Sequence, residues 1–273
     1  MTLLTRRQLI AGAAAAALTT THAASARAAR PIDQFRPSGN GRVDHQALDM
    51  LLKKHVKRDS AGYTTFDYAA LKSRDHAALK AYIVAIEAVA PSSLSVNEAH
   101  AYWINLYNAA TVDIVADYYP VTSIKKINLG GGGLFGSGPW SRKMITVEGT
   151  PLSLDDVEHR IVRALFNDPM SHYGLNCASY SCPNLVETAY TAGNVDSLLV
   201  LNAVDYINHS RGVTVQSGRI TSSKIYSWYA ADFGGRGNLK QHWGQFAEAD
   251  HNAAIKAASL GRFVYDWSLN DAS

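Results

Sequence analysis

Apolar residues in the N-terminal half of the chain recur at helical spacing in three segments, residues 44–56, 73–90 and 95–119. The second and third segments each end at a proline, which stops a helix. The third begins with Ser95 and Glu98 in the spacing of a capping box. Because apolar residues surround most of this third segment, we expect it to be a central helix.

The rest of the chain mixes further helices with short strands. Helices are predicted to start at Ser153, Asn194 and Ser222 or Ser223, with another over residues 239–247. Alternation predicts strands over residues 123–129, 144–148, 171–177 and 263–269, and a hairpin over residues 212–221. The glycine-rich stretch 130–138 predicts a loop, because Pro139 follows where a nucleotide-binding helix would open. This mixture predicts an α+β fold, a single domain with an antiparallel or mixed sheet packed with several helices.

The first 28 residues have the order of an export signal. Arg6 and Arg7 precede a short alanine-rich apolar run, and small residues allow cleavage after Ala26 or Ala28. The apolar run is too short for a convincing membrane span. We therefore expect a twin-arginine signal peptide at 1–28, a periplasmic or secreted product, and no membrane span in the mature protein.

The charge and length of the remaining chain limit its partners and its domain count. Residues 1–28 hold three of the 26 basic residues and no acidic one, so 23 basic and 23 acidic residues remain. A neutral mature chain lacks the excess of positive charge that nucleic-acid binding uses, so we expect no nucleic-acid partner. Its length suits one large domain, which we expect over residues 45–270 after an N-terminal extension at 29–44.

The only two cysteines, Cys177 and Cys182, lie in a segment that also contains His172. In an oxidising compartment, two cysteines five positions apart can form a disulfide that contributes about 2 kcal/mol. Alternatively, one of them is a nucleophile, and Pro183 favours a helix start that places Cys182 at an N-cap and lowers its thiol pKa. Two thiols match no common zinc-site spacing, so no metal or other cofactor is expected.

A thiol nucleophile needs a histidine base and a group that orients it. His172 and His159 are the candidate bases. Asn105 and Asn108 share one face of the central helix and are candidates for the orienting role, as are Asp155 and Asp156. The alternative for both asparagines is structural, because buried amides usually hold neighbouring loops.

Several motifs in order resemble the domain-of-unknown-function family numbered 547. They lie at residues 102–109, 138–140 with Lys143, 151–159, 172–183, 223–229 with 232–233, and 265–270. The resemblance implies one domain over about residues 45–270 and no settled activity. A polar helix followed by a histidine-bearing strand is loosely similar to transglutaminase-like and papain-like thiol hydrolases, although both candidate histidines precede the cysteines here.

Two hypotheses follow from these residues. In the first, the protein is a periplasmic thiol-dependent amide hydrolase or acyl transferase acting on a small-molecule or peptide substrate. Its catalytic residues come from Cys177, Cys182, His172, His159, Asn105 and Asn108. In the second, it is a non-catalytic binding or scaffold domain stapled by a Cys177–Cys182 disulfide.

Overall fold

A computed structural model describes residues 31–130 and 138–272, so the segment predicted as a signal peptide and most of the glycine-rich stretch lie outside the described residues. The α-helices are α1 (Gln46–His55), α2 (Tyr68–Ala70), α3 (His76–Glu87), α4 (Val96–Tyr118), α5 (Arg163–Phe166), α6 (Val195–Asn208), α7 (Ile225–Trp228), α8 (Leu239–Gly244) and α9 (Ala249–Ala257). The strands are β1 (Val56–Arg58), β2 (Thr64–Phe66), β3 (Ile145–Val147), β4 (Thr150–Leu152), β5 (Val213–Gln216), β6 (Arg219–Ser223) and β7 (Ser259–Val264). Two π-helical segments, Leu71–Asp75 and Asp156–Val162, lead into α3 and α5.

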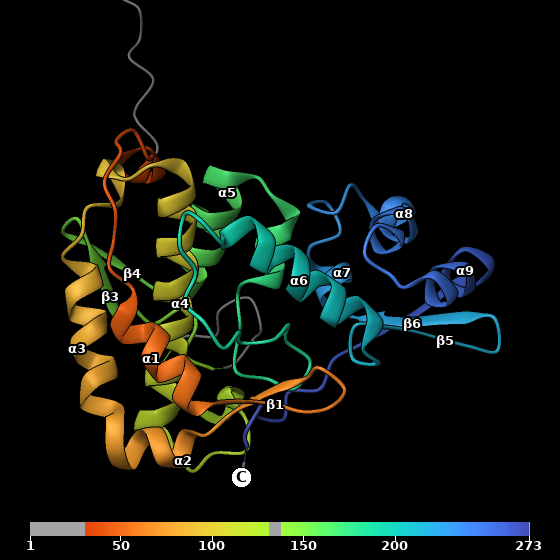
Figure 1. Cartoon of the computed structure of the whole chain (residues 1–273), viewed down its shortest axis with the longest axis horizontal. Helices are drawn as coiled ribbons and strands as arrows, with labels where there is room; N and C mark the ends of the chain where they lie inside the picture. Colours follow the sequence, from red (N-terminus) through yellow and green to blue (C-terminus); the bar gives the residue numbers. More distant parts are fainter. Residues whose placement is uncertain (1–30, 131–137, 273) are drawn as a thin grey trace, which may run out of the picture.

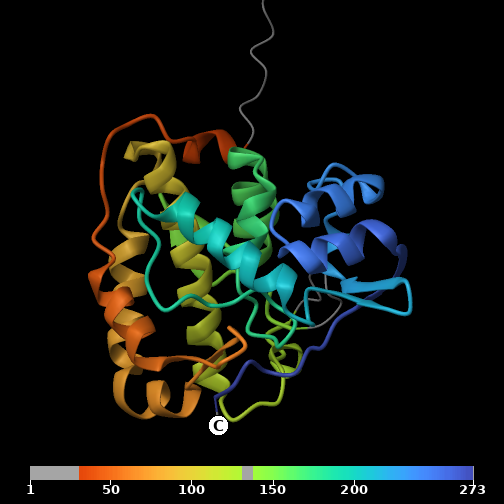
Figure 2. The ribbon, with the colours of Figure 1, turned by 45° about the vertical axis from the view of Figure 1, so that its right-hand side comes forward.

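Helix α4 is the central helix that the sequence predicts. It has 23 residues, and Trp103 and Ile104 on it are fully buried. Helices α1 and α3 lie on one side of it, and α5 and α6 on the other (Figures 1 and 2). The side chain of Ser95 caps its first turn by accepting from the Glu98 N–H. The carboxylate of Glu98 does not complete the capping box, because it accepts instead from the backbone of Val43 and Ala192.

The strands of the described chain form three small sheets. β1 with β2 and β3 with β4 are antiparallel pairs. β5 and β6 form the expected antiparallel hairpin, and β7 joins β6 in parallel, so this three-stranded sheet is mixed. The predicted α+β class with several helices and a mixed sheet is therefore confirmed.

Two of the predicted strands are wrong, and local capping explains both. Residues 123–129 contain a 3-10 turn at Ile124–Lys126, which Ser123 caps through the N–H of Lys125. Residues 171–177 continue a 3-10 helix, Pro169–Tyr173, whose first turn is capped by Asp168. The expected helix start at Pro183 is also absent, so Cys182 lies in a loop and is not an N-cap. The final strand ends at Val264, earlier than the alternation predicts.

The buried side chains form two clusters, and the candidate site lies where they meet. The larger cluster surrounds α4, and the smaller one contains Tyr173, Tyr206, Tyr226 and Trp243 from the part of the chain that includes α6 to α8. Tyr265, just after β7, packs against both clusters. The tail after β7 therefore connects the two parts of the molecule.

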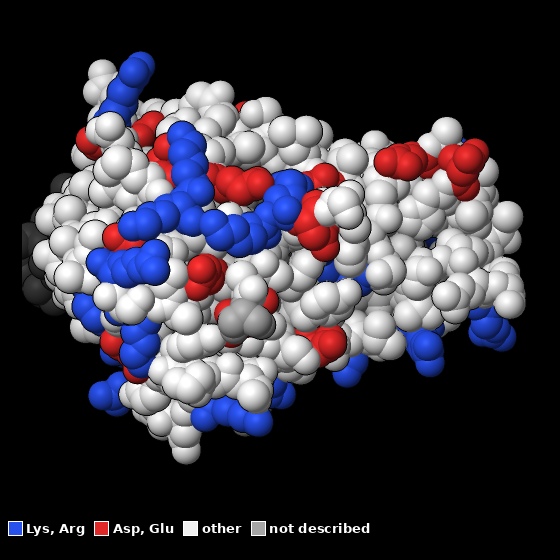
Figure 3. All heavy atoms as spheres, turned by 60° about the horizontal axis from the view of Figure 1, so that its bottom comes forward, with Lys and Arg blue, Asp and Glu red and all other residues white. Residues whose placement is uncertain are grey.

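The surface drawn in Figure 3 carries basic and acidic side chains side by side. Lysine and arginine side chains cross this face next to aspartate and glutamate side chains, with no broad area of one charge. The pattern on this face agrees with the balanced charge of the chain beyond residue 28.

Candidate active site

A tightly bonded loop, residues 174–183, holds the two cysteines. The loop starts at Gly174, where a Cβ atom would lie 2.8 Å from Leu199 and 3.1 Å from Ile104, so a larger residue would have to displace the ends of these two side chains. Asn176 donates to the carbonyl of Pro183 at 2.7 Å and accepts from the N–H of Ala178 at 2.9 Å. These bonds bring the two ends of the loop together and turn both cysteines inward.

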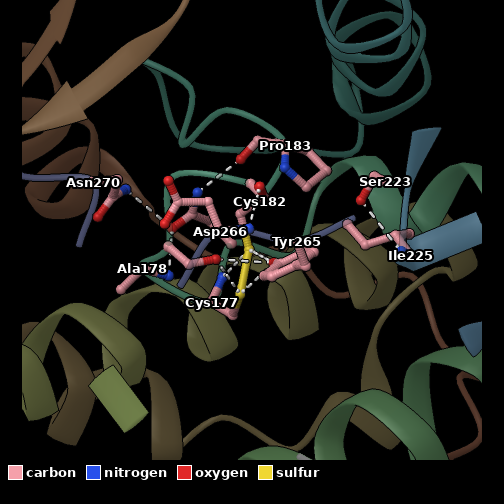
Figure 4. The surroundings of a disulfide bond; sticks show 12 residues. Cys177, Ala178, Cys182, Pro183, Ser223, Ile225, Tyr265, Asp266 and Asn270 are labelled. Atoms are coloured by element: carbon pink, nitrogen blue, oxygen red, sulfur yellow. Dashed lines mark hydrogen bonds between the residues drawn. A yellow bond between two sulfur atoms is a disulfide. The ribbon is translucent and has the colours of Figure 1, made fainter. Parts of the chain in front are cut away.

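Cys177 and Cys182 form a disulfide, with their Cα atoms 6.2 Å apart, and the chain has no free cysteine. The tail after β7 covers the disulfide, and Figure 4 shows Tyr265 pointing at it. The Tyr265 hydroxyl lies 3.1 Å from Sγ of Cys177 and 3.2 Å from Sγ of Cys182, and it accepts from Ser179 at 2.9 Å. Burial raises the pKa of Tyr265 well above its usual value, so this hydroxyl stays protonated. The Cys177 N–H donates to Sγ of Cys182 at 3.0 Å.

His172 is held by an ion-paired carboxylate. Its Nε2 lies 2.8 Å from Oδ2 of Asp232, and Arg163 binds both oxygens of Asp232 at 2.6 and 2.8 Å. Burial of Asp232 favours its neutral form, but the bonds from His172 and Arg163 outweigh burial and hold its pKa well below the usual range. The imidazole also stacks on Tyr229, with ring centroids 4.2 Å apart.

One cavity of about 20 Å³ brings His172 and both sulfurs together. Its lining consists of ionisable, sulfur-bearing, aromatic and aliphatic side chains: Tyr107, Glu158, His172, Leu175, Cys177, Cys182, Ile225, Trp228, Tyr229 and Tyr265. Trp228 is 36% exposed, so this wall reaches the surface. The cavity lining therefore includes a histidine and two cysteines, the residue types that thiol chemistry uses.

The two asparagines on α4 bond to backbone groups. Asn105 donates to the carbonyl of Tyr190 at 2.8 Å and accepts from the same residue's N–H at 3.0 Å. Asn108 donates to the carbonyl of Gly174 and accepts from the N–H of Asn176, each at 2.8 Å. Both side chains therefore hold loops, and Asn108 holds the start of the cysteine loop.

The second candidate base, His159, lies outside the cavity lining. Its Nε2 is 3.6 Å from Oδ1 of Asp155, and its ring centroid is 5.9 Å from that of Tyr229. Both histidines lie next to Tyr229, but only His172 lines the cavity that contains the cysteines. The geometry thus favours His172 over His159 as a group that acts on the sulfurs.

Several important residues of the site were not selected from the sequence. Asp232, Arg163, Glu158, Tyr229 and Tyr265 come from separate elements, and 60 positions separate His172 from Asp232. Local spacing carries no signal for such pairs. All but Arg163 lie in the family-like motifs at residues 151–159, 223–233 and 265–270, which was the only available indication.

One group with metal-ligand chemistry occurs among the described residues, far from the cysteines in sequence. His76, Asp113 and Asp117 place their ligand atoms within 4.8 Å of one another. Lys80 lies 2.9 Å from Asp113 and 3.0 Å from Asp117, so its ammonium group already supplies a cation to both carboxylates. This group therefore has the character of a surface ion-pair network.

Comparison with known proteins gives one match. The family model described as "Protein of unknown function, DUF547" matches residues 91–207. The matched segment covers less than half of the chain and is similar to the DUF547 family. It includes α4, Glu158, His172 and both cysteines, whereas Asp232 and Tyr265 lie beyond the match. No curated protein and no solved structure matches the chain.

The DUF547 match confirms the family resemblance and leaves the activity open. The predicted boundaries of the domain, residues 45–270, extend on both sides of the matched segment. Among the helices of the described residues, none has the length and apolar character needed to cross a bilayer.

Proposed function

We propose that this protein is a thiol-dependent amide hydrolase or acyl transferase that is active when the Cys177–Cys182 bond is reduced. The observation that carries the proposal is the shared pocket of His172 and the two sulfurs, with His172 held by Asp232. A buried histidine beside an ionised carboxylate and two cysteines forms the three-part arrangement of a nucleophile, a base and an orienting group.

The first step is reduction of the disulfide by a dithiol. Thiol–disulfide exchange passes two electrons to the cysteine pair, oxidises the dithiol to its own disulfide, and leaves two thiols in the protein. His172 then takes the proton of one thiol, and the thiolate attacks the amide carbonyl carbon of the substrate. The C–N bond breaks, the amine leaves with the proton from His172, and a thioester remains. Water or an acceptor amine then cleaves the thioester and restores the thiol.

Cys182 is the better stabilised thiolate of the two. Its Sγ accepts from the N–H of Cys177 at 3.0 Å and faces the hydroxyl of Tyr265 at 3.2 Å. Cys177 faces Ser179 at 3.2 Å and the same tyrosine hydroxyl, which has only one proton to donate. Hydrogen bonds to the charged form lower a thiol pKa, so we assign Cys182 as nucleophile and Cys177 as the residue that re-forms the disulfide.

The proposed location is the periplasm or another secreted compartment, reached through the twin-arginine signal. The sequence of Arg6 and Arg7, an apolar run and small residues supports this location. In such a compartment the disulfide is the resting state, because the environment is oxidising. Activity then depends on a thiol reductant that reaches the pocket.

The second candidate function is a binding or scaffold domain in which the disulfide is a permanent staple. The bond between the only two cysteines favours it. The burial of both sulfurs agrees with it as well, since Cys177 is 7% exposed and Cys182 is 3% exposed. In this case His172 and Asp232 hold α5 and the segment after α7 together and do no chemistry.

Alkylation separates the two functions. The intact mass of protein that begins at residue 29 is measured before and after treatment with a dithiol, followed by iodoacetamide at several pH values. We expect no alkylation before reduction. After reduction, one cysteine should react well below the pH at which an ordinary thiol ionises, near 8.5.

A His172→Gln variant gives the decisive comparison, and His251→Gln on α9 is its matched control. The first should slow alkylation of the reduced protein and the second should not. If the disulfide resists the dithiol in the folded protein, or if His172→Gln leaves the rate unchanged, the stapled-domain function is correct and the catalytic proposal is wrong.

A further inference from the structure

Glu158 is a buried carboxyl group without a cation. It is 6% exposed and lines the cysteine pocket. Its Oε2 accepts from the hydroxyl of Tyr107 at 3.0 Å, which is a neutral partner. Among the described residues, no lysine, arginine or histidine forms an ion pair with Glu158, although buried acidic groups are almost always paired.

The neighbouring positive charges already have their own carboxylate. Arg163 binds Asp232 through two bonds, and His172 bonds to the same residue. Neither of these positive groups forms an ion pair with Glu158, whose hydroxyl donor Tyr107 is neutral. A cation that entered the pocket would therefore meet an uncompensated carboxylate.

The pocket wall near Glu158 consists of groups that attract cations. The Tyr229 hydroxyl is buried and faces the Glu158 carboxylate, with which it makes only a loose hydrogen bond in the described chain. Burial raises the pKa of this tyrosine well above its usual value, and the charge of Glu158 adds to the effect. Phenol oxygens accept hydrogen bonds, and the aromatic side chains of Tyr107, Trp228 and Tyr265 line the same cavity.

The size of the cavity limits the cationic group that it can hold. A volume of about 20 Å³ holds roughly one water-sized group, because a single water needs about 10–15 Å³ by this measure. A primary ammonium group has nearly the dimensions of a water molecule and offers three donors, whereas a trimethylammonium group is much larger.

We infer that Glu158, Tyr107 and Tyr229 form a subsite for a primary ammonium group, so that the substrate or acceptor of this protein is an amine-bearing molecule. The assignment of this amine to the substrate rests on the proposed function. The binding of an amine is independent of that function, because the disulfide-bonded protein already contains the subsite. In an acyl transfer, an amine held here would lie in the same pocket as the sulfurs.

The test is the binding of simple probes to the oxidised protein, with no reductant present. Trp228 lines the pocket, so tryptophan fluorescence is the signal, and calorimetry provides a second measurement. The probes are n-butylammonium chloride, 1-butanol and n-butyltrimethylammonium chloride, at constant ionic strength. We expect saturable binding of n-butylammonium, with the alcohol and the trimethylammonium probe each weaker by about tenfold or more.

Variants connect the binding to Glu158. Glu158→Gln keeps the shape and the hydrogen bond from Tyr107, and it should weaken n-butylammonium binding by about tenfold or more. Tyr229→Phe should give a smaller loss, and Glu248→Gln at an exposed position is the matched control that should change nothing. Equal binding of the alcohol, equal binding of the trimethylammonium probe, or full binding by Glu158→Gln would overturn the inference.

The same measurements separate this inference from the proposed function. If the reduced protein shows the His172-dependent thiol reactivity but no amine binding, only the ammonium subsite is wrong. If the oxidised protein binds the amine but the thiols are inert, only the catalytic proposal is wrong, and the subsite then belongs to a binding domain.

Discussion

Nε2 of His172 and Oδ2 of Asp232 lie 2.8 Å apart, although 60 residues separate them in the sequence. The pair joins the 3-10 helix before the cysteine loop to the segment after α7. Arg163, in α5, bonds to the same carboxylate from a third element. One ionised side chain therefore orients the candidate base and also links three parts of the fold.

Replacing Asp232 by asparagine should destabilise the protein at neutral pH by about 2 kcal/mol, because Arg163 and His172 lose a charged partner. The pKa of Asp232 is lower in the folded than in the unfolded chain. Its stabilising effect is therefore complete above the unfolded value of about 3.9 and is lost as the pH falls through the folded value. Urea denaturation at pH 7 and at decreasing acidic pH should show the difference between wild type and Asp232→Asn shrinking.

The control for this experiment is Asp250→Asn at an exposed position on α9, which should leave the free energy of unfolding unchanged at both pH values. A difference between wild type and Asp232→Asn that grew in acid would contradict the assigned pKa direction.

The helices and the hairpin were predictable because their signals are local. Ser95 and the proline after Tyr119 set the ends of α4, and the alternation in residues 212–221 gave β5 and β6. The false strand at residues 171–177 shows the limit of this method. Asp168 caps a 3-10 turn there. The apolar residues that follow it are buried in the core as part of a loop and not as a strand.

The site was predictable only in part. The cysteines and His172 are close in sequence and were selected together, and their contact with one pocket agrees with that selection. The orienting partner of the histidine was sought among two amides and two carboxylates, because either group can orient an imidazole: Asn105, Asn108, Asp155 and Asp156. Tertiary packing decides whether these amides bond to the backbone or to the histidine ring. The spacing of residues on a helix carries no information about that packing.

Asn108→Ala should reduce stability by about 2 kcal/mol or more, because it leaves the carbonyl of Gly174 and the N–H of Asn176 buried without partners. Asn105→Ala should behave similarly through Tyr190. Chemical denaturation measures both losses. In protein that remains folded, neither variant should change the pH profile of cysteine alkylation. A shifted profile with unchanged stability would show that the amide acts on the thiol instead of on the backbone.

Removing the disulfide should cost about 2 kcal/mol, because Cys177 and Cys182 are five positions apart and close only a small loop. The double variant Cys177→Ser with Cys182→Ser is compared with wild type by urea denaturation. The difference should be present without reductant and should become small when wild type is fully reduced. If the two proteins remain equally different under reducing conditions, packing of the sulfurs and not the cross-link stabilises this loop.

His242 should remain neutral in the folded protein well below the pH at which an ordinary histidine is charged. Burial disfavours its imidazolium form and, with the nearby His172, lowers its pKa to about 4. Its Nε2 lies 2.8 Å from the hydroxyl of Tyr173, a bond in which a neutral imidazole accepts. An NMR titration should therefore show the His242 ring signals changing near pH 4, and signals that moved near the ordinary value of about 6.5 would contradict this environment.

The same shift predicts a loss of stability in mild acid. As the pH falls from about 6.5 towards about 4, the unfolded chain binds a proton at His242 that the folded chain does not, so the free energy of unfolding decreases over this range. His242→Gln removes this proton uptake and should flatten the pH dependence of stability there. The slope should be reduced rather than abolished, because burial also lowers the pKa of His45 and His100. An unchanged slope in His242→Gln would assign the acid sensitivity to those other histidines.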